Sequence, residues 1–195
     1  DFIDGLIDCQ TEQYFEDFLP KKYSSQFLDV GVYDCSTSNM FRKKYGTGNE
    51  IVLFEPDKNN ISQFNELYAA LPNSRLIQKG LSNLKQTLRF KSNGSASTVS
   101  DDGDIEIEVV PLDYLPKITP SLIKIDIEGG ELEALKGARG TIEKHRPVLA
   151  IACYHSPQQF IDVPKYIIEN TSNYNYYFRH YTESIYESVF FAVPA

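Results

Sequence analysis

The stretch SLIKIDIEGGELEALKGA, residues 121–138, carries a strand signal, a glycine turn and a helix signal in direct succession. Residues 121–127 form an apolar run typical of a buried strand, and apolar residues at helical spacing follow the turn. Asp126 and Glu128 stand at the junction. A buried carboxylate is costly unless it is paired or hydrogen-bonded, so we expect this strand to end at a rim that faces a ligand.

The same alternation of strand and helix extends in both directions along the chain. Short connections between such elements predict an α/β fold with a parallel, doubly wound sheet and helices on both faces. Ligands of these folds bind beyond the carboxyl ends of the strands. The predicted strands are residues 26–31, 50–56, 74–80, 121–128 and 147–155, and the predicted helices are residues 36–46, 57–71, 130–145 and 156–170.

Two pairs of segments depart from this alternation of strand and helix. Residues 87–92 and 104–115 alternate apolar and polar side chains and predict an inserted β-hairpin. The tip of this hairpin, residues 92–104, is rich in Gly, Ser and Asp. Residues 174–182 and 188–195 predict an antiparallel pair at one edge of the sheet.

The start of the chain predicts an amphipathic helix that Pro20 ends. We therefore divide the chain into an N-terminal helical segment, residues 1–25, and one domain, residues 26–195. This segment and the hairpin tip are the expected lids or specificity elements, because insertions at a strand rim commonly select the substrate.

Composition narrows the class of protein. The chain has 195 residues, with 42% apolar and 24% charged residues, which is ordinary for one globular domain. Its net charge of −8 disfavours nucleic acid and anionic membrane as partners, and no apolar run reaches the ~18 residues of a membrane span. The N-terminus lacks the features of a signal peptide. Three unpaired cysteines, Cys9, Cys35 and Cys153, disfavour a disulfide framework and fit a cytoplasmic location.

Polar residues follow each predicted parallel strand. Because the carboxyl ends of parallel strands meet at one edge, we expect these residues to converge on one ligand cleft. The residues at this rim are Asp29, Gly31, Tyr33, Asp34, Glu55, Pro56, Asp57, Lys79, Gly80, Asp126, Glu128, Tyr154 and His155.

The rim indicates a nucleoside without phosphate groups. Glu55 lies 24 positions after Gly31, where a carboxylate can accept hydrogen bonds from two ribose hydroxyls. The turn lacks GxGxxG, and Asp34 would repel a pyrophosphate, so we predict Asp34 beside a cationic ligand. S-adenosylmethionine, with its adenosine, ammonium and sulfonium groups, fits this pattern.

Several of these residues also have a purely structural explanation. Gly31 could be required only for the turn after the strand and not for a ligand, and Glu55 could cap the helix that begins near Asp57. Glu128 could act only through the dipole of the following helix, which is worth roughly 0.3–1 kcal/mol. His155 could be an ordinary loop or cap residue, and Glu131 and Glu133 are expected to form a solvated first helical turn.

The motifs FLDVGVYDCSTS, LFEPDKNN, QKGLSN, PLDYL, IKIDIEGGELEALKGA and VFFAVP together resemble the FkbM family of S-adenosylmethionine-dependent methyltransferases. The resemblance covers roughly residues 26–194. It implies the class I methyltransferase Rossmann-like fold, with a seven-stranded, mostly parallel sheet and one antiparallel strand. It also implies methylation of a hydroxyl on a small molecule, such as a sugar or a natural-product scaffold.

The resemblance assigns most of the rim to the cofactor. Glu55 would hold the ribose, and Asp126 would lie near the amino acid part or the reacting methyl group. The methionine pocket would be shaped by Asp29, Gly31 and Tyr33, and the adenine would lie beside Pro56, Asp57, Lys79 and Gly80. The chain departs from the family pattern at Cys35 and Ser36, in a turn where Gly or another small polar residue is common, and at Cys153, where an acid is common.

Methyl transfer from a sulfonium requires the nucleophile, carbon and sulfur in line, and an alcohol must lose its proton as the bond forms. The catalytic candidates are His155, Asp126 and Glu128; our hypothesis is that Asp126 orients the acceptor and His155 deprotonates it. We expect no metal, although Asp126, Glu128 and another rim oxygen could hold Mg²⁺ as an alternative.

Two rival functions stay open at this point. A nucleotide-dependent oxidoreductase could use a similar sheet, although the missing GxGxxG and Asp34 count against it. The chain could also be a non-catalytic ligand- or partner-binding domain of a larger protein, for which Cys35 and Cys153 leave room. The sequence predicts neither the methyl acceptor nor the oligomeric state.

Overall fold

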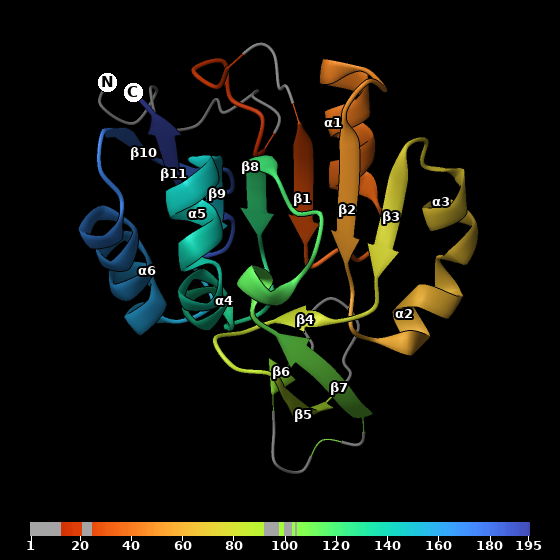
Figure 1. Ribbon diagram of the computed structural model, residues 1–195. Helices are drawn as coiled ribbons and strands as arrows, with labels where there is room; N and C mark the ends of the chain where they lie inside the picture. Colours follow the sequence, from red (N-terminus) through yellow and green to blue (C-terminus); the bar gives the residue numbers. More distant parts are fainter. Residues whose placement is uncertain (1–12, 21–24, 92–97, 100–102, 104) are drawn as a thin grey trace.

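The computed structural model describes residues 13–20, 25–91, 98–99, 103 and 105–195 (Figure 1). In these residues, seven strands form one sheet in the order β10-β11-β9-β8-β1-β2-β3. The strands of this sheet are β1 (Gln26–Val30), β2 (Glu50–Phe54), β3 (Ser74–Ile77), β8 (Pro120–Ile125), β9 (Val148–Ala152), β10 (Tyr174–His180) and β11 (Ser188–Pro194). The helices are α1 (Ser36–Tyr45), α2 (Lys58–Gln63), α3 (Asn65–Ala70), α4 (Glu131–Gly137), α5 (Arg139–His145) and α6 (Pro157–Asn170).

The strand pairing confirms the predicted class I methyltransferase fold. Strand β1 lies inside the sheet and pairs in parallel with β2 and β8, and β9 continues the parallel set beside β8. Strand β11 runs antiparallel to both of its neighbours, β9 and β10. The predicted edge pair and the single antiparallel strand are therefore confirmed.

Alternate residues of the central strands pack into two hydrophobic layers, one on each face of the sheet. Leu28 and Val52 lie in the layer that α4, α5 and α6 cover. Phe27 and Ile51 lie in the opposite layer, against α1, α3 and residues 13–20. Burial on both faces explains why these strands are almost entirely apolar in sequence.

Residues 13–20 form turns rather than the predicted helix, so that expectation is wrong for this stretch. Phe15 is fully buried and makes ring contacts with Phe27 and Phe41. Its side chain gains more from this aromatic cluster than from a helix on the surface. The rest of the predicted helix, residues 1–12, lies outside the described residues, as do residues 21–24 of the N-terminal segment.

Two predicted helices are each divided in two. Phe64 separates α2 from α3, and Ala138 separates α4 from α5. At the second break the backbone packs tightly, because a Cβ on Gly137 would lie 2.0 Å from the Ser82 carbonyl oxygen. Helix α1 begins without a side-chain cap, because Cys35 precedes it in a left-handed conformation with φ 62°.

A smaller sheet in the order β4-β7-β5-β6 lies beyond the carboxyl ends of β1, β2, β3 and β8 (Figure 1). It consists of β4 (Gly80–Leu81), β5 (Gln86–Lys91), β6 (Thr98–Val99) and β7 (Ile105–Val110). The antiparallel pairing of β5 with β7 confirms the inserted hairpin, and β4 pairs with β7 in parallel. Most of the predicted tip, residues 92–104, lies outside the described residues.

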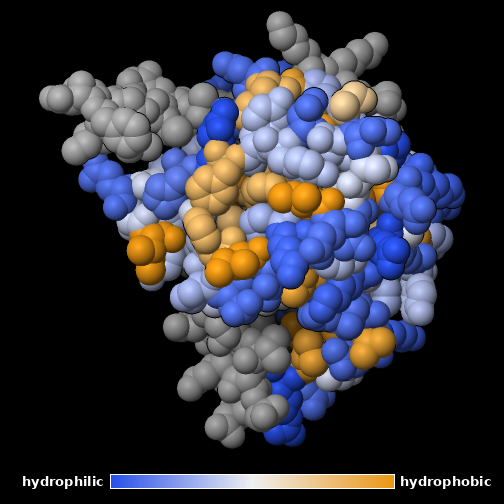
Figure 2. All heavy atoms as spheres, turned by 90° about the vertical axis from the view of Figure 1, so that its left-hand side faces the viewer, coloured by the Kyte–Doolittle hydropathy of each residue, from blue (hydrophilic) through white to orange (hydrophobic). Residues whose placement is uncertain are grey.

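The edge of the large sheet carries exposed apolar side chains. Phe160 of α6 and Phe178 of β10 are in edge-to-face contact at the surface. Figure 2 shows this side of the molecule, with apolar groups set among hydrophilic ones. None of the helices in the described part of the chain has the length and apolar character of a membrane span.

Candidate functional site

A cavity of about 990 Å³ opens between the carboxyl ends of the central strands and the small sheet. Its position follows from the topology, because the strand order reverses between β1 and β8. The predicted site residues that line it are Gly31, Tyr33, Glu55, Pro56, Gly80, Asp126, Glu128 and His155. The predicted residues Asp29, Asp34, Asp57 and Lys79 do not line it.

Asp29 lies beneath the cavity, within the sheet. Its carboxylate accepts a hydrogen bond from Ser38 Oγ at 2.6 Å and lies 3.2 Å from Lys124 Nζ. The buried ammonium of Lys124 also donates to the carbonyl oxygen of Gly31 at 2.9 Å. Burial alone would lower the pKa of Lys124, but Asp29 and Asp126 raise it above its usual value. Asp29 and Lys124 therefore hold the turn after β1 from below.

Gly31 brings this turn against the end of β8. Its φ is +84°, and a Cβ at this position would lie 1.8 Å from the carbonyl oxygen of Asp126. Its N–H donates to the carbonyl of Phe54 at 3.1 Å. The glycine is thus required by the close approach of three strand ends.

Glu55 is buried at the end of β2, and it is not the cap of the next helix. Asp57 caps α2, since its Oδ1 accepts from the N–H of Asn59 at 2.8 Å. Glu55 Oε1 instead accepts from the N–H of Asp57 at 2.7 Å. Burial raises the pKa of Glu55 to about 7, although hydrogen bonding to the Asp57 N–H opposes this shift.

Asp34 and Lys79 are engaged elsewhere. Asp34 Oδ1 accepts from the N–H of Ser36 at 2.9 Å, which stabilises the turn before α1. Lys79 forms an ion pair with Glu108 of β7 on the outside of the small sheet. Neither side chain faces the cavity in this structure.

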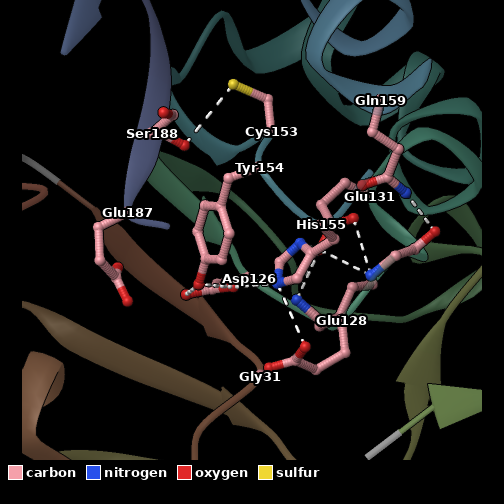
Figure 3. Close-up of polar contacts among 12 residues, drawn as sticks. Gly31, Asp126, Glu128, Glu131, Cys153, Tyr154, His155, Gln159, Glu187 and Ser188 are labelled. Carbon is pink, nitrogen blue, oxygen red and sulfur yellow. Dashed lines mark hydrogen bonds and ion pairs between the residues drawn. The ribbon is translucent and has the colours of Figure 1, made fainter. Parts of the chain in front are cut away.

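An imidazole surrounded by three carboxylates lies beyond the carboxyl ends of β8 and β9 (Figure 3). His155 Nε2 lies 3.3 Å from Asp126 Oδ1 and 3.4 Å from Glu128 Oε2. His155 Nδ1 lies 3.2 Å from Glu131 Oε1. The structure therefore brings all three predicted catalytic residues together and adds Glu131.

This environment shifts two pKa values. Burial alone would lower the pKa of His155, but Asp126 and Glu131 raise it to about 10. Burial alone would raise the pKa of Asp126, but His155 and Lys124 lower it to about 2. The raised pKa favours the imidazolium form of His155, which disfavours the part of our hypothesis in which it accepts a proton.

Glu131 corrects a second expectation. We expected a solvated side chain, but Glu131 is fully buried. Its Oε1 accepts from the N–H of Ile127 at 2.8 Å, and its Oε2 accepts from the N–H of Gly129 at 3.1 Å. The carboxylate therefore fixes the loop that carries Glu128, whose φ is +57°. Glu133, in contrast, is partly exposed to solvent, as expected, and forms an ion pair with Lys136.

Two tyrosines hold Asp126, and sequence reasoning missed one of them. Tyr14 Oη donates to Asp126 Oδ2 at 2.7 Å, and Tyr154 Oη donates to Asp126 Oδ1 at 3.3 Å. Tyr154 follows β9 and lines the cavity, as its predicted place at the rim implies, although its contact with Asp126 was not predicted. Tyr14 carries no such signal, because it precedes Asp126 by 112 residues.

The model of the methyltransferase FkbM domain matches residues 29–181. The chain belongs to the FkbM methyltransferase family. The methyltransferase FkbM from Methylobacillus flagellatus KT is 26% identical to it and superposes with a TM-score of 0.74. This match covers 92% of the present chain and 46% of the other, so the chain spans less than half the length of that relative. No curated protein matches the chain.

More distant structures share only the fold with this FkbM chain. An rRNA methylase from Streptococcus thermophilus is 11% identical, with a TM-score of 0.55 and coverage of 91% and 90% of the two chains. A protein from Streptococcus mutans, assigned as a methyltransferase and solved in complex with SAH, is 12% identical, with a TM-score of 0.51 and coverage of 89% and 90%.

The two cysteines at which this FkbM chain departs from the family pattern are both buried free thiols. Cys153 lies beside the carbonyl oxygen of Ser188, with 3.6 Å between sulfur and oxygen. Burial raises the pKa of each thiol to about 12. Cys153 therefore does not offer the negative charge that an acid would supply at its position.

Proposed function

We propose that this chain binds S-adenosylmethionine and transfers its methyl group to a hydroxyl of a small molecule. The observation that carries the proposal is the convergence of Gly31, Glu55 and Asp126 on one cavity, from the ends of three parallel strands. Family membership supports the same cofactor. The predicted cytoplasmic location and the absence of nucleic acid and membrane partners stay predictions.

The cavity gives each part of the cofactor a plausible neighbour. Glu55 would accept hydrogen bonds from the ribose hydroxyls, and Pro56 and Gly80 would flank the adenine. The backbone at Gly31 would approach the methionine part. Asp29, Asp34, Asp57 and Lys79 would contribute indirectly, through the turns and ion pairs that they stabilise.

The acceptor would enter at the end of the cavity formed by Asp126, Glu128 and His155. In the transfer an acceptor oxygen forms a bond to the methyl carbon while the bond from that carbon to sulfur breaks, and S-adenosylhomocysteine leaves. The hydroxyl proton passes to solvent. Much of the acceleration can come from holding oxygen, carbon and sulfur in line.

Calorimetry tests the cofactor. We expect binding of S-adenosylmethionine and S-adenosylhomocysteine, and no binding of NAD⁺. Glu55→Gln should weaken binding by about 10–100-fold, because hydrogen bonds to a charged group are worth about 1.5–3 kcal/mol. Glu66→Gln, an exposed acid in the first turn of α3, serves as the matched control and should bind normally. Tight NAD⁺ binding would instead support the alternative that the protein is a nucleotide-dependent oxidoreductase.

The pH dependence of cofactor binding provides a second test. Ribose hydroxyls favour the ionised form of Glu55, whose pKa is about 7 in the unliganded protein. Affinity should therefore be full above this pKa and fall as the pH drops toward 5.5, by up to about tenfold per pH unit. In Glu55→Gln this dependence should flatten. Equal pH profiles for the two proteins would show that Glu55 does not hold the ribose.

Release of S-adenosylhomocysteine in the presence of candidate hydroxyl acceptors tests the transfer itself. Sugars and polyketide-like alcohols are the acceptor classes to screen. A protein that binds the cofactor tightly but turns over no acceptor would favour the non-catalytic alternative.

A further inference from the structure

The cluster around His155 contains more electron-pair donors than the methyl-transfer proposal needs. Each ring nitrogen faces at least one carboxylate oxygen, at 3.2–3.4 Å. One donor atom from each of Asp126, Glu131 and His155 lies within 4.8 Å of the others, and Glu128 adds an oxygen, Oε2, 3.4 Å from His155 Nε2. Asp126, Glu128 and His155 also line the cavity, so the cluster is accessible to a small ligand.

The imidazole is buried but has unsatisfied hydrogen-bonding capacity. Its side chain is 7% exposed, and neither Nδ1 nor Nε2 has a hydrogen-bond partner of acceptable geometry among the described residues. The nearby carboxylates make charge contacts with the ring rather than directed hydrogen bonds. A buried polar group in this state calls for an explanation, and an absent ion is one of the standard ones.

Glu131 decides which nitrogen is available to an ion. Its oxygens are already bonded to the N–H groups of Ile127 and Gly129, and Oε1 faces His155 Nδ1. When an imidazole binds a metal through one nitrogen, its other N–H commonly donates to a carboxylate, and Glu131 is the carboxylate that lies beside Nδ1. His155 Nε2 is thereby left facing Asp126 and Glu128.

The distances around Nε2 resemble those between neighbouring ligands of one ion. Atoms bound at about 2.1 Å lie about 3.0–3.4 Å from one another in octahedral or tetrahedral geometry. The separations of Nε2 from Asp126 Oδ1 and Glu128 Oε2 are 3.3 and 3.4 Å. One imidazole with two carboxylates is also a ligand set that suits transition metals and leaves coordination positions open.

We propose that Asp126, Glu128 and His155 bind one divalent transition-metal ion of the Mn²⁺ type, with Glu131 as a positioning residue. The open coordination positions would face the cavity. An acceptor hydroxyl bound there would lose its proton more readily. That use of the ion rests on the proposed methyl transfer, whereas the binding of the ion does not. The rival explanation is that a protonated His155 alone neutralises the carboxylates.

These explanations are separated by titrating the chelator-treated full chain with Mn²⁺ and monitoring the bound ion by electron paramagnetic resonance. We expect one saturable site. His155→Gln and Glu128→Gln each remove a ligand and should raise the dissociation constant at least about tenfold, and Glu131→Gln should raise it about 10–100-fold. Glu143→Gln, an exposed acid on α5, is the control and should bind as the unmodified chain does.

Circular dichroism establishes that each variant is folded. If His155→Gln unfolds, Glu128→Gln carries the test, because its side chain is 32% exposed and its loss leaves the core intact. No saturable Mn²⁺ binding up to about 1 mM, or equal binding by all variants, would overturn the metal site. Intact S-adenosylmethionine binding in that case would leave the proposed function standing.

Discussion

Gly31→Ala is expected to destabilise the protein by about 4 kcal/mol or more and to abolish cofactor binding. The added methyl carbon would lie 1.8 Å from the carbonyl oxygen of Asp126 and 2.9 Å from Cγ2 of Ile127. Because the first of these atoms is backbone at the end of a central strand, the overlap cannot be relieved by a rotamer change. Relief requires β1 and β8 to separate at the floor of the cavity.

Gly46→Ala is the matched control. Gly46 also has a positive φ, +77°, but a Cβ there would meet no atom within 4 Å. Its replacement should therefore cost only the backbone strain, about 1–3 kcal/mol. Urea unfolding of the two variants isolates the contribution of the close approach. An equal loss of stability in both would mean that strand β8 yields at Asp126 and that the turn is not rigid.

The contrast between these glycines shows what the sequence can predict. Gly31 follows an apolar run of strand length, and that local pattern predicts a turn at a strand end. The same kind of local signal places Glu55 and Asp126 at strand ends. Because all parallel strands end at one edge, local signals predict the sheet and much of the rim of the cavity. They do not show that the cavity is not lined by Asp29, Asp34, Asp57 and Lys79.

Contacts between distant parts of the chain were not predictable in this way. Nothing near Tyr14 indicates that its hydroxyl meets Asp126, and the apolar residues around it suggested a helix instead. Glu131 follows two glycines at the start of a helix, where acids are commonly solvated. Its burial depends on a loop with positive φ at Glu128 and on the position of His155, which only the tertiary structure fixes.

Lys124 is a different case, because its signal was present in the sequence. The central strand SLIKI contains one charged residue in an otherwise apolar run. A lysine in a strand covered on both faces must be paired, and the only strand partners are its neighbours β1 and β9. The register places Lys124 opposite Asp29, which is the acid that it contacts.

Lys124→Met is therefore expected to destabilise the protein by about 3–5 kcal/mol, because it leaves the carboxylate of Asp29 buried without a counter-charge. The loss should be constant between about pH 6 and 9. The pKa of Lys124 is raised in the folded state, so its contribution is fully present below the unfolded-state value and is lost only at higher pH. Urea unfolding across this range measures both features.

The double variant Asp29→Asn, Lys124→Met separates the effect of the unpaired Asp29 charge on stability from the effect of the lost Lys124 packing. Asparagine keeps a hydrogen-bond acceptor for Ser38 but carries no charge, so the double variant should regain about 1–3 kcal/mol over Lys124→Met. The carbonyl oxygen of Gly31 stays without its ammonium donor in both variants, so cofactor binding should remain weakened even where stability returns. If the double variant were as unstable as the sum of the two single variants, Asp29 and Lys124 would act independently, and Lys124 would stabilise the turn through its backbone contacts alone.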